Sequence, residues 1–216
     1  MPNHLRVTTH LSHDRSEKEA TAFLAAFKAR TDGHPPLFTS DKLPAYIEAL
    51  SANYSMPEPP PRRRGRGRPR KQPRRVLDPG LRYAQVDKQR EGGRVVEVCR
   101  RIIFGSTEII TESLGDKQIN TSYVERDNLT SRQSNGRLVR KTLSYSKKHY
   151  YLQRHLDLED AVFNFVRPHQ ALRMSLSRPI PGRKWYQRTP AMAAGLTDHR
   201  WTLEELLSYR IPPLRG

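Results

Sequence analysis

Residues 35–54 read PPLFTSDKLPAYIEALSANY, and this stretch decides the fold class. Its first part, residues 35–41, is short, apolar and bounded by prolines, which predicts a buried strand that ends at Asp41. The part after Asp41 predicts a helix. Residues 16–30 predict an earlier amphipathic helix, because its apolar residues follow the i, i+3, i+4, i+7 spacing: Ala20, Phe23, Leu24 and Phe27. Ser16 with Glu19 forms a capping-box pattern at its start. A helix, a strand and a helix in this order indicate an α/β fold.

The rest of the chain divides by composition. Residues 56–80 are rich in Pro, Arg and Gly, which predicts a disordered linker. Two β-rich runs flank Gly92-Gly93 and predict a hairpin, and helices are expected within residues 106–114, 119–141 and 144–166. Past residue 173 we expect an irregular basic tail with two short helices, which begin at Thr189 and at the Thr202–Glu205 capping box. The predicted domains are therefore residues 1–55, 56–80, 81–170 and 171–216.

The charge of the chain indicates a polyanionic partner. The formal net charge is +17 over 216 residues, which favours nucleic acid or an anionic membrane surface. No stretch approaches the roughly 18 apolar residues of a membrane-spanning helix, and no signal peptide opens the sequence, so nucleic acid is the better candidate. Cys99 is the only cysteine, which excludes an internal disulfide and a cysteine-based zinc site and fits a reducing cytoplasm.

The basic run PRRRGRGRPRKQPRR (residues 61–75) holds nine cationic side chains. Within it, a glycine can enter a narrow groove and a proline keeps the segment extended, so the flanking arginines can reach along the floor of an A-tract minor groove. This segment resembles an AT-hook, and sequence-independent phosphate binding or a charge run without a nucleic-acid partner are the alternatives. The residues expected to contact DNA are Arg66, Gly67, Arg68, Pro69, Arg70 and Lys71.

Two carboxylates have positions that fit either a structural or a catalytic role. Asp41 lies at the predicted end of a strand, where an ordinary helix N-cap would also lie. Glu125 follows Ser122 by three residues and so completes a second capping-box pattern. Each residue alone is explained by helix capping.

Together with the flanking motifs, these carboxylates resemble a known family. INTSYVERDNLT (residues 119–130) and TPAMAAG (residues 189–195) are its most specific pieces, and the resemblance extends over about residues 16–200. On these motifs the chain resembles bacterial insertion-sequence transposases of the DDE class, more narrowly those related to insertion sequence one.

The resemblance implies an RNase H-like fold and a two-metal site for cleavage and strand transfer of DNA. Asp41 matches the second aspartate and Glu125 the closing glutamate, and together they would bind Mg²⁺ or Mn²⁺. Arg132 matches a basic residue directed toward DNA. Independently of the family, its spacing of seven residues from Glu125 places both on one helix face.

The chain departs from the family at its start. The first aspartate and the first strands expected of the family have no counterpart before residue 16, and Asp14 matches a different region. We therefore expect an incomplete RNase H-like fold, an N-terminally truncated chain and weakened catalysis. Exposed strand edges favour a homo-oligomer or a mixed oligomer with full-length transposase. The expected location is the bacterial nucleoid, with insertion-sequence ends and AT-rich DNA as partners.

Other functions stay open. The chain could be a non-catalytic DNA-binding fragment that coats AT-rich DNA or interferes with full-length transposase. An RNA-binding role is a third reading, which the AT-hook-like segment disfavours, because A-form RNA lacks a narrow minor groove. Trp185 and Tyr186 lie among arginines and lysines, where either anchoring of the tail in the core or stacking on DNA is expected.

Overall fold

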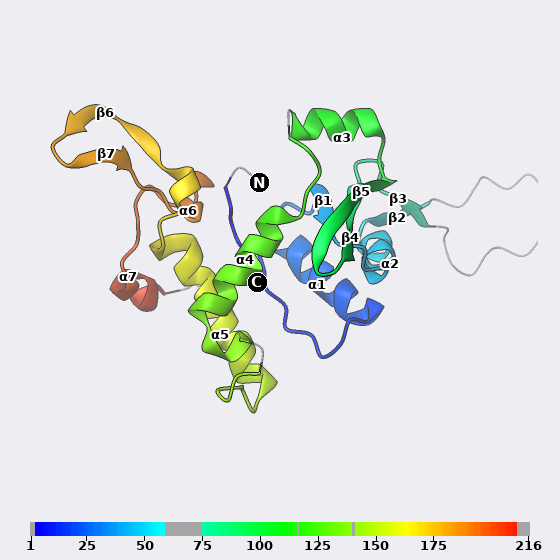
Figure 1. Cartoon of the computed structure of the whole chain (residues 1–216), viewed down its shortest axis with the longest axis horizontal. Helices are drawn as coiled ribbons and strands as arrows, with labels where there is room; N and C mark the ends of the chain where they lie inside the picture. The colour runs from blue at the N-terminus through cyan, green and yellow to red at the C-terminus, as the bar shows by residue number, and fades with distance from the viewer. Residues whose placement is uncertain (1–2, 59–74, 116, 140, 211–216) are drawn as a thin grey trace, which may run out of the picture. The chain divides into compact units, whose positions relative to one another are not determined.

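The structure is a computed structural model that describes residues 3–58, 75–115, 117–139 and 141–210. It confirms the predicted α/β class (Figure 1). The chain forms two compact units. Unit 1 comprises Met1–Leu11 and Ser144–Gly216, and unit 2 comprises Ser12–Leu143. Within the described ranges, no helix is both long and apolar enough to cross a membrane.

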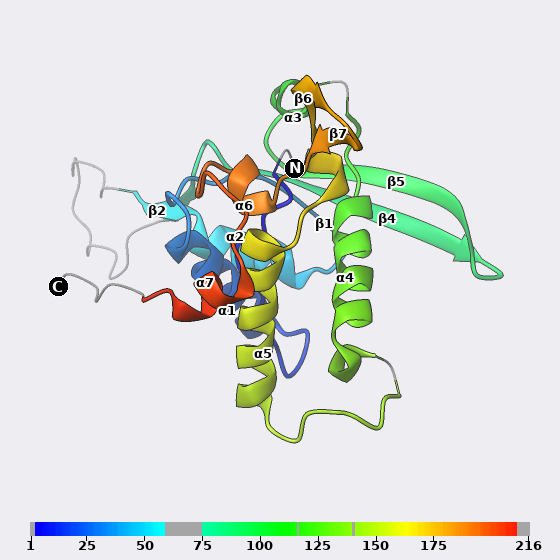
Figure 2. The ribbon, with the colours of Figure 1, turned by 90° about the vertical axis from the view of Figure 1, so that its left-hand side faces the viewer.

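Unit 2 is built on a three-stranded mixed sheet of order β1-β4-β5. β1 (Leu37–Ser40) runs parallel to β4 (Arg82–Glu91), with Ser40 opposite Gln85. β5 (Arg94–Phe104) returns antiparallel to β4, and the two strands extend beyond β1 as a ribbon (Figure 2). Gly92 and Gly93 both have positive φ, at 54° and 80°, which a two-residue hairpin turn requires. The predicted hairpin is therefore confirmed.

Two helices cover the sheet and form the core of unit 2. α1 (Glu17–Ala29) begins at Ser16, whose hydroxyl accepts from the backbone N–H of Glu19 as predicted. α2 (Ala45–Asn53) follows β1. Burial of a large apolar side chain, such as that of Leu24 or Leu50, contributes about 1.5–3 kcal/mol of transfer free energy. The buried residues of this core are Ala20, Leu24, Ala49, Leu50, Tyr54, Leu81 and Tyr83.

The remaining elements of unit 2 lie around this core. α3 (Thr107–Leu114) and α4 (Ser122–Ser134) follow β5, and a short 3₁₀ helix covers Gly136–Leu138. The ends of the predicted linker pair as two antiparallel strands, β2 (Ser55–Pro57) and β3 (Arg75–Leu77). The AT-hook-like residues 66–71 lie outside the described residues.

Unit 1 is mainly helical. α5 (His149–Ala161) continues into a π-helix, Val162–Val166, and a 3₁₀ turn covers Gln170–Leu172. α6 (Pro190–Ala193) and α7 (Leu203–Ser208) confirm the two predicted short helices, including the Thr202–Glu205 capping box.

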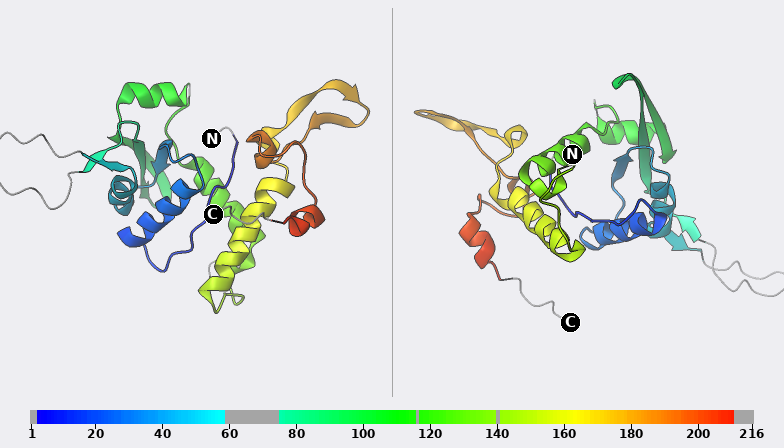
Figure 3. Two further views of the ribbon diagram at one scale, coloured as in Figure 1. Left: turned by 180° about the vertical axis from the view of Figure 1, so that it is seen from behind. Right: turned by 60° about the horizontal axis from the view of Figure 1, so that its bottom comes forward.

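A hairpin in unit 1 was not predicted. β6 (Met174–Ile180) and β7 (Arg183–Tyr186) pair antiparallel in a stretch that was expected to be irregular (Figure 3). The expectation was wrong because the turn residues Pro181-Gly182 and the alternation of the short strands give only a weak pattern. Gly182 has φ 77°, which suits the turn.

The N-terminal segment of unit 1 is held by side-chain amides of α5 and the π-helix. Arg6 N–H donates to Asn164 Oδ1 (2.9 Å), and Asn164 Nδ2 donates to the Arg6 carbonyl (2.8 Å). Further along the same segment, Leu11 N–H donates to Gln153 Oε1, and Gln153 Nε2 donates to the Thr9 carbonyl. Each amide thus replaces a backbone partner that a neighbouring strand would supply.

Candidate functional site

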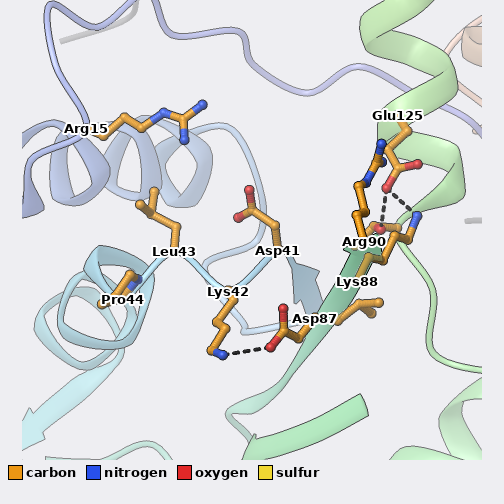
Figure 4. A pocket seen from close by; sticks show the side chains of 11 residues that line it. Arg15, Asp41, Lys42, Leu43, Pro44, Asp87, Lys88, Arg90 and Glu125 are labelled. Carbon is orange, nitrogen blue, oxygen red and sulfur yellow. Dashed lines mark hydrogen bonds and ion pairs between the residues drawn. The ribbon is translucent and has the colours of Figure 1, made fainter. Parts of the chain in front are cut away.

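A pocket of about 380 Å³ opens in unit 2 where β1 ends (Figure 4). Since β1 and β4 are parallel, residues that follow the end of β1 meet residues in the middle of β4 at one edge of the sheet. The start of α4 closes the other side. The pocket is lined by Arg15, Asp41, Lys42, Leu43, Pro44, Val86, Asp87, Lys88, Arg90, Thr121 and Glu125.

A chain of hydrogen bonds fixes the backbone next to Asp41. Gln85 Nε2 donates to Tyr83 Oη (2.9 Å), Tyr83 Oη lies 2.7 Å from Ser40 Oγ, and Ser40 Oγ donates to the Asp41 carbonyl (2.7 Å). Because Ser40 uses its proton on Asp41, Tyr83 is the donor to Ser40. Burial raises the pKa of the Tyr83 phenol, which keeps this donor protonated.

Asp41 faces the pocket, between Arg15 and Glu125 (Figure 4). The N-cap of α2 is Pro44, so an N-cap role for Asp41 is excluded. The carboxylate of Asp41 has no hydrogen bond or ion pair with any residue that the structure describes.

Glu125 lies in the first turn of α4 and binds a lysine across the pocket. Its Oε1 accepts from Lys88 Nζ (2.5 Å) and from Thr121 Oγ1 (2.9 Å). The bond from Lys88, followed by that from Thr121, lowers the pKa of the Glu125 carboxyl below its ordinary value. The predicted Ser122–Glu125 capping box is wrong: Thr121 is the N-cap, and the hydroxyl of Ser122 donates to Asn120.

Asp87 is a third carboxylate of the pocket, which the sequence did not single out. It lies on β4, and its Oδ2 is 2.6 Å from Lys42 Nζ. Asp87 lies near Asp41 because β1 and β4 pair in parallel. A sequence pattern that identifies each strand separately does not reveal which strands pair. The available signal in the sequence was an acidic residue directly after residues 83–86, a run that the structure shows to be buried.

The carboxylate oxygens of the pocket, in their present contacts, do not form a binding site for a divalent metal ion. Carboxylate oxygens are ligands that Mg²⁺ prefers, but Asp87 and Glu125 each have a lysine partner. Among the described residues, no group of three or more His, Cys, Asp or Glu side chains could hold a metal ion. Mg²⁺ or Mn²⁺ therefore stays a prediction.

Cations outnumber acids in the pocket lining. The four cationic residues are Arg15, Lys42, Lys88 and Arg90, against three carboxylates. Within the described part of the chain, the guanidinium groups of Arg15 and Arg90 form neither hydrogen bonds nor ion pairs. Both are therefore available to an anionic group such as a phosphate.

The other predicted site residues lie elsewhere. Arg132 is exposed in the last turn of α4, two turns from Glu125, and does not line the pocket. Asp14 accepts from the backbone N–H of Ser16 (2.9 Å), at the start of α1, and is also outside the lining. The AT-hook-like segment is not among the described residues.

Comparisons of the chain with models of protein families, with curated proteins and with solved structures found no match.

Proposed function

We propose that this chain is a DNA-binding protein of DNA transposition, with a fold related to the RNase H-like domain of DDE transposases. One observation carries the proposal: Asp41 and Glu125, which are far apart in the sequence, line the same pocket. In the DDE class an aspartate follows a strand and the closing glutamate lies on a helix. Asp41 follows β1 and Glu125 lies in the first turn of α4, so both positions support the relationship.

The charge of the chain supports DNA as the partner. The net charge is +17, and two guanidinium groups of the pocket are available to phosphates.

β1 is an edge strand of its sheet. An edge strand offers unpaired backbone groups to another chain, which supports a homo-oligomer or a mixed oligomer with full-length transposase. The proposed location is the bacterial nucleoid.

A second candidate function is DNA binding without cleavage. The ion pairs Lys88–Glu125 and Lys42–Asp87 favour it, because lysines already supply positive charge to two of the three carboxylates. In this function the pocket contacts DNA phosphates, and the chain occupies DNA that a full-length transposase would otherwise bind. Mg²⁺ or Mn²⁺ belongs to the first function only.

Plasmid nicking tests the two functions against each other. The purified full chain is incubated with supercoiled plasmid and Mg²⁺ or Mn²⁺, beside Asp41→Asn, Glu125→Gln and the control Glu112→Gln, an exposed glutamate on α3. Duplex binding is measured in parallel by fluorescence anisotropy at increasing salt. Nicking that both pocket variants lose and the control keeps supports the transposase. Salt-sensitive binding without nicking supports the second function, and absence of both contradicts both.

The AT-hook-like segment has its own test. Arg68→Ala should weaken binding to AT-rich duplexes more than binding to GC-rich duplexes, since minor-groove insertion depends on groove width. Equal weakening on both duplexes would instead assign Arg68 to phosphate contacts.

A further inference from the structure

We propose that the β6–β7 hairpin of unit 1 is a binding surface for single-stranded DNA. We call Arg173 to Tyr186 the aromatic hairpin; it comprises β6, β7 and the preceding arginine. It shares no residue with the pocket of unit 2. The choice of DNA over RNA rests on the proposed function, whereas the binding surface itself does not require the chain to cleave DNA.

The stretch of sequence that contains the aromatic hairpin carries positive charges only. No Asp or Glu occurs between Asp160 and Asp198. A stretch with cations only presents a positive field that attracts a polyanion and repels other cations. The cationic residues of this stretch are Arg167, Arg173, Arg178, Arg183, Lys184 and Arg188.

Two large rings of the hairpin are open to solvent. Trp185 is 42% exposed and Tyr186 is 45% exposed. The two residues are neighbours in β7, so their side chains point to opposite faces of the ribbon. Met174, 50% exposed, lies opposite Tyr186 in the pairing register. The exposure disfavours the expectation that these rings anchor the tail in a core.

A cation already lies over the indole of Trp185. The guanidinium carbon of Arg173 is 4.4 Å from the ring centroid. An arginine stacked on a ring keeps its donors at the ring edge, where they reach a phosphate next to a stacked base. The pair thus combines the two elements of single-strand binding, an aromatic platform and a backbone cation.

The base of the hairpin is fixed, which favours a preorganised surface. Arg188 Nε donates to the Leu172 carbonyl (2.9 Å), and His169 N–H donates to the Arg188 carbonyl (2.9 Å). Leu172 and Thr189, which flank the hairpin, are both buried. These contacts fix the two ends of the hairpin ribbon, which Figure 3 shows in gold and orange.

Single-stranded DNA fits these rings better than a duplex. Stacking requires a free base face, and the bases of a duplex already stack on one another. A ribbon that reads base edges in the major groove uses polar side chains instead. The aromatic hairpin presents an indole on one face and a phenol on the other.

The test compares two oligonucleotides that differ only in their bases. Affinities of the full chain for a labelled oligo(dT) and for an abasic strand of the same length are measured by anisotropy in EDTA. Trp185→Ala should weaken oligo(dT) binding about tenfold and leave abasic binding unchanged, while Trp185→Phe should retain most of the affinity. Phosphate binding by the basic run at residues 61–75 contributes equally to the affinities for the two strands, so it cancels in the ratio of these affinities.

Arg178→Ala is the matched control, since this exposed cation lies on the same hairpin. It should weaken binding to both strands equally and reduce the salt slope by about one. Circular dichroism confirms that each variant is folded, and Trp185→Leu, which keeps an apolar side chain but has no aromatic face, replaces Trp185→Ala if that variant unfolds.

Three outcomes would overturn the proposal. Equal losses on oligo(dT) and the abasic strand for Trp185→Ala would leave only charge binding. A tighter complex with duplex than with oligo(dT), weakened by Trp185→Ala, would assign the hairpin to a groove. Tighter binding of oligo(U) would assign it to RNA. Because no cleavage is measured, a failed nicking experiment leaves this test unaffected.

Discussion

The ammonium group of Lys88 lies 2.5 Å from Oε1 of Glu125, so β4 places a cation on the carboxylate that α4 presents to the pocket. Asp41, on the opposite side of the pocket, lacks such a partner among the described residues. The two carboxylates that define the proposed relationship are thus electrostatically different: one is neutralised internally, and the other faces the pocket with its charge.

Replacing Lys88 should expose Glu125 to divalent cations. Lys88→Met removes the strongest contact that lowers the pKa of Glu125, so this pKa should rise toward its ordinary value. An exposed ion pair is worth about 1 kcal/mol or less, so Mn²⁺ affinity should increase by roughly fivefold. Titration of Mn²⁺ followed by electron paramagnetic resonance measures this. The control is Lys117→Met, at an exposed lysine outside the pocket, which should leave the Mn²⁺ affinity unchanged. If Lys88→Met also leaves the Mn²⁺ affinity unchanged, Lys88 does not compete with the ion.

The hydrogen-bond chain beside Asp41 should be important for stability. Tyr83→Phe removes the hydroxyl that links Gln85 to Ser40, and it leaves the buried amide of Gln85 without this acceptor. The free energy of unfolding should fall by about 1–3 kcal/mol, as for other buried polar groups that lose a partner. Urea denaturation measures the change. Tyr145→Phe, at a tyrosine that is 66% exposed, should change it by less than about 0.5 kcal/mol.

Arg6 should be essential for unit 1. Its guanidinium group lies 4.0 Å from the ring centroid of Phe163 and within 3.5 Å of Glu159 and 3.4 Å of Asp160. The side chain of Arg6 is only 7% exposed. Arg6→Met removes the buried cation that contacts both acids, which should cost about 3–5 kcal/mol.

Arg154→Met tests the same change at an exposed pair. Arg154 contacts Asp157 at 3.3 Å with 64% of its side chain exposed, so its loss should destabilise unit 1 far less than the loss of Arg6. Thermal unfolding of both variants, monitored by circular dichroism, compares them. Similar melting temperatures for Arg6→Met and Arg154→Met would contradict a structural role for Arg6.

The C-terminal helix α7 should depend on pH through His199. Hydrogen bonds to Asp198 (2.6 Å) and to Glu205 (2.9 Å) raise the pKa of His199 above its ordinary value. A raised pKa means that the contribution of His199 to stability is fully present below its unfolded pKa of about 6.5. The contribution is lost as the pH rises through the folded pKa, so α7 should loosen on the alkaline side.

Fluorescence of Trp201 reports this loosening, since its ring lies 4.7 Å from Phe165 and 5.2 Å from Tyr209. His199→Gln should abolish the pH dependence of this signal, and His155→Gln, an exposed histidine on α5, should preserve it. A pH profile that His199→Gln leaves unchanged would assign the transition to another group.

Local rules were sufficient for most elements. The Ser16 cap, the hairpin glycines at 92 and 93 and the Thr202–Glu205 box are each specified by residues within a few positions of one another, and all three are present. Such features are readable because capping and positive φ depend on local chemistry. The α/β class is confirmed for the same reason.

Features that depend on pairing between distant segments were not predictable. The position of Asp87 beside Asp41 follows from the parallel pairing of β1 with β4, and the Lys88–Glu125 contact follows from where α4 meets β4. The supposed Ser122 cap shows the reverse error: a local pattern was present, but Glu125 binds Lys88 and Thr121 instead. Tertiary contacts decided between two local options.

The hydrogen bonds that tie the N-terminal segment to α5 and the π-helix have a consequence for the order of folding. Arg6 and Asn164 are 158 positions apart, whereas unit 2 is one continuous stretch, Ser12–Leu143. A ribosome adds about 5–20 residues per second, so residues 3–11 wait roughly ten to thirty seconds for their partners. Unit 2 can complete its core during that delay. Unit 1 is then completed last, because its two parts flank unit 2 in the sequence and its loop closure must wait for residues 144–210.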